Sequence, residues 1–293
     1  MRRSMTLLLA LVGAVGPSCS ERSTTPPVEP VLRIAAVAAQ PDHPQEQFRP
    51  LAMYLNERLR VRVEIVPVHS PGTAVELFVR GYVTLAWLDG LGGVRARHEV
   101  RGARAIAQGD TDRDNFSFFV AHVRTGLTRS VRFPAALANL RFTFGPERSI
   151  PEHLMPEYFI RQATGLWPEQ FFTRAIGFSG GSERTLALIE SGEYDAGVID
   201  QNVYIEWVKA GKISANVVRV VWRTPAFAMH NWTVHPALEE QFGSGFTARL
   251  QDALLAIDDP AVLTGLDRQH LVPASDRLYE GIRVIAVERG LLR

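Results

Sequence analysis

The sequence predicts an α/β protein of two lobes, each built on a mostly parallel β-sheet that is flanked by helices. Three observations support this prediction. Apolar runs typical of strands alternate with helical periodicity from residue 31 to residue 123, the same alternation restarts near residue 141, and the chain after residue 236 is mainly helical. A chain that alternates in this way places crossover helices between parallel strands. We therefore expect two sheets joined by crossings of the chain.

The composition supports two hydrophobic cores and excludes one class of partner. The chain has 293 residues, 46% of them hydrophobic, which is enough for two ordinary domains. Its net charge is +1, with charges of both signs spread along the sequence. A nucleic-acid-binding protein would carry a clustered basic stripe, so we expect no nucleic acid as a partner.

The N-terminus has the pattern of an export signal. Arg2 and Arg3 precede a short apolar run, 5–15, that is too short to span a bilayer comfortably. Cys19 is the only cysteine and follows small residues, as in a bacterial lipoprotein cleavage site. We therefore predict a signal peptide over 1–19, lipidation of Cys19, and a location in the periplasm or on the outer face of the cell membrane. The alternative is an incidental cysteine behind a conventionally cleaved signal.

The first lobe is expected to begin after a flexible tether. Residues 20–30 are rich in Ser, Thr and Pro, which suits a linker between the membrane and the folded protein. The apolar run 31–39 suits a strand buried on both faces, and apolar residues recur at helical spacing in 48–59. The other expected elements of this part are strands at 61–68, 84–88, 103–108 and 116–123 and a helix at 74–79.

The second part of the chain repeats the alternation. Strands are expected at 141–145, 174–179, 195–200, 217–224 and 231–234, and helices at 153–163, 186–191 and 203–209.

Two crossings would connect the lobes, at 122–127 and 223–228. Lobe 1 would then comprise 31–123 together with 226–293, and lobe 2 would comprise 124–225. In this discontinuous arrangement a ligand binds where the strand ends of the two lobes face each other.

Several stretches resemble one family of binding proteins. They are Phe48-Arg-Pro-Leu-Ala-x-Tyr-Leu55, Gly81-x-x-x-Leu-Ala-Trp-Leu88, Phe144-Gly145, His153-Leu-Met-Pro-x-Tyr-Phe159, Asp195-Ala-Gly197 and Asn231-Trp-Thr-Val234. In order and spacing, over about residues 31–275, the chain resembles the phosphate/phosphonate-type substrate-binding proteins of ABC transporters, most closely the selenate-binding branch.

The resemblance implies a type II periplasmic-binding-protein fold with hinge crossings between the lobes. It also implies an extracytoplasmic solute-binding protein of an ABC importer, which captures a small oxyanion such as phosphonate, phosphite, phosphate or selenate by hinge closure. The implied partners are the permease and ATPase subunits of the importer. The protein is expected to act as a monomer and to need no cofactor.

The loop before the helix at 153–163 is the first candidate for anion binding, because a helix N-terminus offers unpaired N–H groups and a partial positive charge. In relatives this loop is rich in Ser, Thr and Gly. Here only Ser149 remains of that hydroxyl cluster. Ser149 and Glu152 also have the spacing of a capping box, in which Glu152 would accept from the Ser149 amide. The alternative is therefore a self-capped helix that binds no ligand.

The loop 179–182 is the second candidate. Relatives often carry a histidine about where Ser182 stands, and Ser182 can still donate a hydrogen bond. Gly180 and Gly181 allow a close approach of the backbone. The alternative is a plain helix N-cap, and one residue can serve both purposes.

The first lobe is expected to contribute five residues to the ligand site. Gln40 and Trp87 lie at strand ends, and Asp89 follows Trp87 at the expected mouth of the cleft. In the family, Asn231 and Trp232 are placed to line the cleft just beyond the second crossing. The alternatives are a core position for Trp87, and an Asn turn with a buried Trp at 231–232.

Other chemistry lacks a sequence pattern. The eight histidines show no spacing typical of a metal site, no Gly-x-Ser-x-Gly motif is present, and no Gly-Lys-Ser/Thr loop could hold ATP. We therefore predict neither a metal nor enzymatic activity. Two alternatives to the importer remain: an orphan or sensory binding protein of the same fold with an altered ligand, and, less favoured, an extracytoplasmic enzyme.

Overall fold

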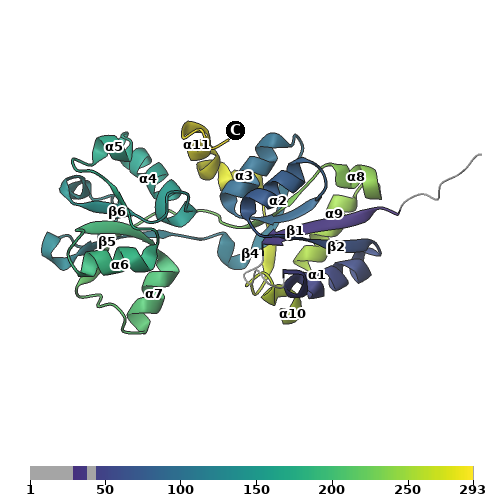
Figure 1. Ribbon diagram of the computed structural model, residues 1–293, viewed down its shortest axis with the longest axis horizontal. Helices are drawn as coiled ribbons and strands as arrows, with labels where there is room; N and C mark the ends of the chain where they lie inside the picture. Colours follow the sequence, from purple (N-terminus) through teal and green to yellow (C-terminus); the bar gives the residue numbers. More distant parts are fainter. Residues whose placement is uncertain (1–28, 38–43, 293) are drawn as a thin grey trace, which may run out of the picture.

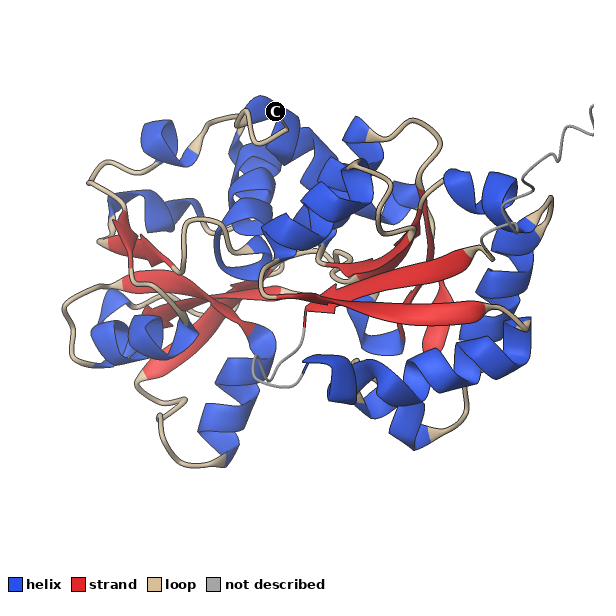
Figure 2. Cartoon of the chain, turned by 45° about the vertical axis from the view of Figure 1, so that its right-hand side comes forward, coloured by secondary structure: helices blue, strands red, loops and turns tan. Residues whose placement is uncertain are grey.

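The computed structural model describes residues 29–37 and 44–292 and contains two separate β-sheets (Figure 1). Red strands form both sheets in Figure 2, with helices packed on their two sides. The predicted two-lobed α/β fold is confirmed. Both sheets are mixed in their pairing rather than mostly parallel as predicted, because each also contains antiparallel pairs. Within the described residues no helix is long and apolar enough to cross a membrane.

The sheet of lobe 1 has six strands in the order β2-β1-β3-β10-β4-β11. β1 pairs in parallel with β2 and β3, whereas β10 is antiparallel to both of its neighbours and β11 is antiparallel to β4. The bounds are β1 Val31–Val37, β2 Arg62–Val68, β3 Leu85–Leu88, β4 Arg104–Gly109, β10 Asn231–Val234 and β11 Leu271–Pro273.

Helices cover both faces of this sheet because the side chains of a strand alternate between its faces. In β1, Leu32 and Ile34 join the core beneath α1, α9 and α10, while Ala35 joins the core beneath α2 and α3. The helices of this lobe are α1 Pro44–Leu59, α2 Pro71–Val79, α3 Gly90–Glu99, α8 Ala237–Phe242, α9 Phe246–Leu255 and α10 Pro260–Thr264.

The sheet of lobe 2 has five strands in the order β7-β6-β8-β5-β9, of which β5 is antiparallel to β8 and β9. An aromatic core that includes Phe119, Phe142 and Trp222 lies on one side of this sheet. The elements are β5 Ser117–His122, β6 Phe142–Phe144, β7 Gly177–Phe178, β8 Ala196–Asp200, β9 Val218–Arg223, α4 Met155–Thr164, α5 Pro168–Phe171, α6 Ser182–Glu190 and α7 Gln201–Lys209.

The strand pairing corrects one predicted crossing. β5 pairs with β8 and β9, so the chain enters lobe 2 over residues 110–116, and the predicted crossing at 122–127 is wrong. The periodicity of a strand does not reveal which sheet it joins. The second crossing, 224–230, overlaps the predicted segment. The two crossings lie side by side, since Asn115 and Phe227 exchange backbone hydrogen bonds of 3.1 and 3.0 Å.

The C-terminal helix α11 (Glu280–Glu288) contacts both lobes. It packs against α3 of lobe 1 and α4 of lobe 2, as its position between them in Figure 1 indicates. Just after the helix, Arg289 forms ion pairs with Glu157 of α4 and with Glu169 of α5, the latter at 2.9 Å. The side chain of Glu157 is fully buried, so Arg289 supplies a charge that this carboxylate requires.

We predict that Arg289→Met lowers the free energy of unfolding by about 3 kcal/mol, because it leaves the buried carboxylate of Glu157 without its counter-charge. His153 lies 3.6 Å from Glu157, but burial lowers the pKa of that histidine and keeps it neutral at pH 7. Denaturant unfolding measures the change. The control is Arg283→Met in helix α11, which removes the exposed pair with Glu280 and should leave stability nearly unchanged. Equal effects of the two substitutions would contradict the prediction.

Candidate ligand site

A cavity of about 310 Å³ opens at the carboxyl ends of β1 and β3, where ligands bind in open α/β sheets. Its volume is at the small end of the range for ligand pockets, about 300–1,000 Å³. The lining residues are Val37, Gln47, Pro71, Trp87, Leu88, Asp89, His230, Gly265, Leu266, Asp267 and Arg268. The cavity therefore suits a small solute.

Two predicted residues, Trp87 and Asp89, line this cavity. The indole of Trp87 stacks on the His230 ring, with centroids 5.7 Å apart and planes inclined by 15°. The Arg268 guanidinium lies 5.8 Å from the same indole. Asp89 is the N-cap of α3, and its Oδ1 accepts from the Gly92 N–H at 2.6 Å. Asp89 thus combines a structural role with a position at the cavity wall.

Behind this wall, Asp112 is enclosed where the crossings meet lobe 1. Only 1% of the residue is exposed. Arg268 donates from Nε and Nη2 at 2.6 and 2.7 Å, and the backbone N–H groups of Gly109 and His230 donate at 3.1 and 3.0 Å. Burial alone would raise the pKa of Asp112, but the hydrogen bonds from Arg268 and His230 outweigh burial and hold it at about 2.

Sequence reasoning missed His230 and Arg268. Arg268 and Asp112 are 156 positions apart, and no local spacing links them. His230 precedes a short strand by one residue and belongs to no motif. Only the folded chain brings these side chains to one cavity.

On lobe 2, Ser149 caps a helical turn, residues 150–154, that leads into α4. Its Oγ accepts from the Glu152 N–H at 3.2 Å. The reciprocal half of the predicted capping box does not form, because the Ser149 N–H donates to the Pro146 carbonyl at 3.0 Å. The Glu152 carboxylate instead accepts a hydrogen bond from the Ser182 hydroxyl.

Ser182 is the first residue of α6 and lies buried beside two acids. Its hydroxyl donates to Glu152, which is 8% exposed, and accepts from the Asp200 N–H at 2.8 Å. Burial raises the pKa of Glu152, the Ser182 hydroxyl partly offsets that effect, and the Asp200 carboxylate raises it further. Burial also raises the pKa of Asp200.

Two predicted cleft residues lie elsewhere. Trp232 is fully buried in the lobe 1 core, where its ring contacts Trp87, and Asn231 is fully buried on the opposite face of β10. The Asn231 Oδ1 accepts from Arg97 at 3.1 Å and from Thr233 at 2.6 Å. The reason is that β10 is a central strand with both faces covered. Gln40 and Cys19 lie outside the described residues.

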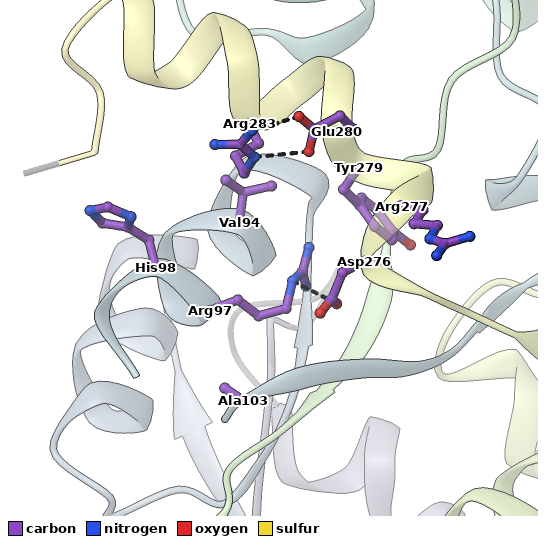
Figure 3. Close-up of a pocket in the computed structure, with 9 residues that line it drawn as sticks. All are labelled: Val94, Arg97, His98, Ala103, Asp276, Arg277, Tyr279, Glu280 and Arg283. Carbon is purple, nitrogen blue, oxygen red and sulfur yellow. Dashed lines mark hydrogen bonds and ion pairs between the residues drawn. The ribbon is translucent and has the colours of Figure 1, made fainter. Parts of the chain in front are cut away.

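A second cavity, of about 430 Å³, lies between α3 and the start of α11 (Figure 3). Arg97 points into this region and pairs with Asp276 at 3.1 Å, and its guanidinium stacks over the Tyr279 ring at 4.9 Å. Arg283 pairs with Glu280 at the rim. These interactions hold the C-terminal segment against α3, so we assign this cavity a structural role.

The two halves of the candidate site meet at the first turn of α3. A Cβ atom placed on Gly90 would lie 3.3 Å from the Ile150 side chain. Gly90 follows Asp89, and Ile150 follows Ser149. Ile150 also belongs to an apolar cluster with Val94 of α3 and Ile282 of α11. The lobe 1 wall and the lobe 2 turn are therefore neighbouring segments.

Comparison with known proteins gives consistent results. A family model described as the periplasmic substrate-binding protein of a phosphonate ABC transporter matches residues 35–279. The chain is 32% identical over 272 residues to a probable ABC transporter phosphite-binding protein, PhnD1, of Prochlorococcus marinus (strain MIT 9301), covering 89% of this chain and 91% of that protein.

Solved structures share the fold. PhnD1 of Prochlorococcus marinus in complex with methylphosphonate matches with a TM-score of 0.64 at 31% identity, over 89% of this chain and 98% of that chain. XAC2383 of Xanthomonas citri bound to ATP matches with a TM-score of 0.64 at 16% identity, over 88% and 99%. The second likeness concerns the fold alone.

We predict that Asp112→Asn lowers the free energy of unfolding at pH 7 by about 3 kcal/mol, because Arg268 loses its buried counter-charge. The depressed pKa of Asp112 means that its carboxylate contributes about 2 kcal/mol above pH 4. This contribution is lost as the pH falls toward 2. Denaturant unfolding between pH 7 and pH 2 should therefore show a smaller loss on acidification for the variant than for the wild type. The exposed neighbour Asp114→Asn serves as the control, and parallel pH profiles for wild type and Asp112→Asn would refute the assignment.

Proposed function

Because the chain belongs to the phosphonate-type periplasmic substrate-binding proteins of ABC transporters, we propose that it captures a small oxyanion between its lobes for an importer. Phosphonate, phosphite, phosphate and selenate are the candidate ligands. The permease and ATPase subunits of the importer would receive the ligand-loaded, closed form. The protein would act outside the cytoplasm as a monomer, with no catalytic step of its own.

The observation that carries this proposal is the small cavity at the strand ends of lobe 1, which Trp87 and His230 line. Gly90, next to the lining residue Asp89, lies close to Ile150 of the lobe 2 turn that Ser149 caps. Helix α6 begins at Ser182 in the same lobe, and a helix N-terminus favours an anion. The paired crossings at Asn115 and Phe227 form a two-stranded hinge. Bending there would bring donors from both lobes onto one ligand.

A membrane anchor through Cys19 belongs to the same proposal. An export signal and a cysteine after small residues support it. Labelling of bacteria that express the protein with a radioactive fatty acid should mark the wild-type chain. The Cys19→Ala variant should remain unlabelled, and equal labelling of both would exclude this anchor.

An orphan or sensory binding protein with an altered ligand is the second candidate. The acidic pair Glu152 and Asp200 favours it, because two carboxyl groups beside the α6 N-terminus oppose an incoming anion. A receptor of this kind would bind none of the oxyanions named above and would be encoded apart from a permease and an ATPase.

We predict that the purified protein, freed of carried-over ligand by unfolding and refolding, binds at least one of methylphosphonate, phosphite, phosphate, sulfate and selenate in isothermal titration calorimetry. His230→Ala should weaken that binding about tenfold, the value of one hydrogen bond to a charged group. The matched control is His98→Ala, since His98 lines the second cavity on the far side of α3. Silence toward every anion from folded protein would refute the proposal. Equal effects of the two substitutions would place the ligand elsewhere.

A further inference from the structure

The two candidate loops of lobe 2 enclose a buried acid. Glu152 is 8% exposed, and its carboxylate accepts the hydrogen bond of the Ser182 hydroxyl. The lone pairs of that hydroxyl are also engaged, because the Asp200 N–H donates to it at 2.8 Å. Ser149 differs, since its Oγ accepts from the Glu152 N–H and this bond does not use its own O–H. Ser182 is therefore not a free donor for an anion while Glu152 accepts its proton.

The electrostatic surroundings of Glu152 disfavour a second anion. From the end of β8 it is faced by the Asp200 carboxyl, and burial raises the pKa of both acids. His153, the next residue, turns away: its Nδ1 lies 2.5 Å from the Glu147 carbonyl and its Nε2 lies 3.6 Å from Glu157. Helix α11, which also packs on this turn, contributes the apolar Ile282. No basic side chain is among the groups that shift the pKa of Glu152 in the described structure.

We infer that anion capture at this site is coupled to the uptake of one proton, which is held between the carboxyl group of Glu152 and an oxygen of the ligand. The inference rests on the proposed function and names the residue that sets its pH dependence. An ionised carboxylate offers only acceptors, whereas a protonated one offers a donor. One proton therefore converts Glu152 from a group that repels the anion into a group that binds it, and Ser182 keeps its present partners.

The direction of the pH effect follows from this exchange. Above the pKa of Glu152, every bound anion must bring or acquire one proton, so the Kd rises about tenfold per pH unit. In Glu152→Gln the amide N–H₂ replaces the donor without titrating, and the side chain keeps its shape. Its Kd should be nearly independent of pH over the same range.

The test is calorimetric titration of methylphosphonate into the purified protein, at a pH high enough for the ligand to be a dianion. Two buffers of different ionisation enthalpy give the number of protons taken up. The wild type should take up one proton more than Glu152→Gln. The control is Glu147→Gln, an exposed acid of the same loop, which should take up as many protons as the wild type.

The outcomes separate the inference from the function that it rests on. Binding by the wild type with the same proton count as Glu152→Gln would overturn the inference and leave oxyanion capture standing. Binding by Glu152→Gln alone would show that Glu152 excludes the anion, which also overturns it. Silence from all three folded proteins would overturn both proposals. Should Glu152→Gln fail to fold, the Kd of the wild type is measured between pH 6 and pH 9 instead. A Kd that does not change with pH would overturn the inference, because it is incompatible with an exchanged proton.

Discussion

The arrangement of lobe 1 depends on the buried carboxylate of Asp112. A charge enclosed in this way costs several kcal/mol unless it is paired and hydrogen-bonded. Its partners come from three parts of the chain: Gly109 at the end of β4, His230 before β10, and Arg268 before β11. The requirement to satisfy one side chain therefore fixes the end of a strand, the return crossing and the C-terminal segment together. The same arrangement forms one wall of the cavity, because it holds Arg268 and His230 against the ring of Trp87.

The two halves of the site differ in chemistry. Lobe 1 presents the stacked rings of Trp87 and His230, which define a shape, with the Arg268 guanidinium beside them. Lobe 2 presents a hydroxyl, a helix N-terminus and two acids, which respond to charge and to protons. Recognition in this protein would combine selection by size on one side with selection by protonation on the other. A family assignment alone does not show this division, because it depends on the buried position of Glu152 beside Ser182.

The elements were predictable from local patterns, and their partners were not. Leu32, Ile34 and Ala36 alternate along β1, and burial on a sheet has that period. The same logic cannot assign β5 to a sheet, because an alternating strand looks alike in either lobe. Trp87 was predictable as a strand end at the cavity, but Trp232, opposite it in the ladder, entered the core. Pairs that are far apart in the sequence, such as Asp112 and Arg268, cannot be predicted from the spacing of residues.

The position of β10 in the first sheet has a consequence for the order of folding. β10 lies between β3 and β4, although lobe 2 separates it from both along the chain. Lobe 2 is continuous, so it can complete its sheet as soon as β9 has emerged. In lobe 1, β3 and β4 cannot be joined in one sheet until β10 is available, which belongs to the last quarter of the chain. Such non-local closure is slow, and it leaves apolar strand edges open in the meantime.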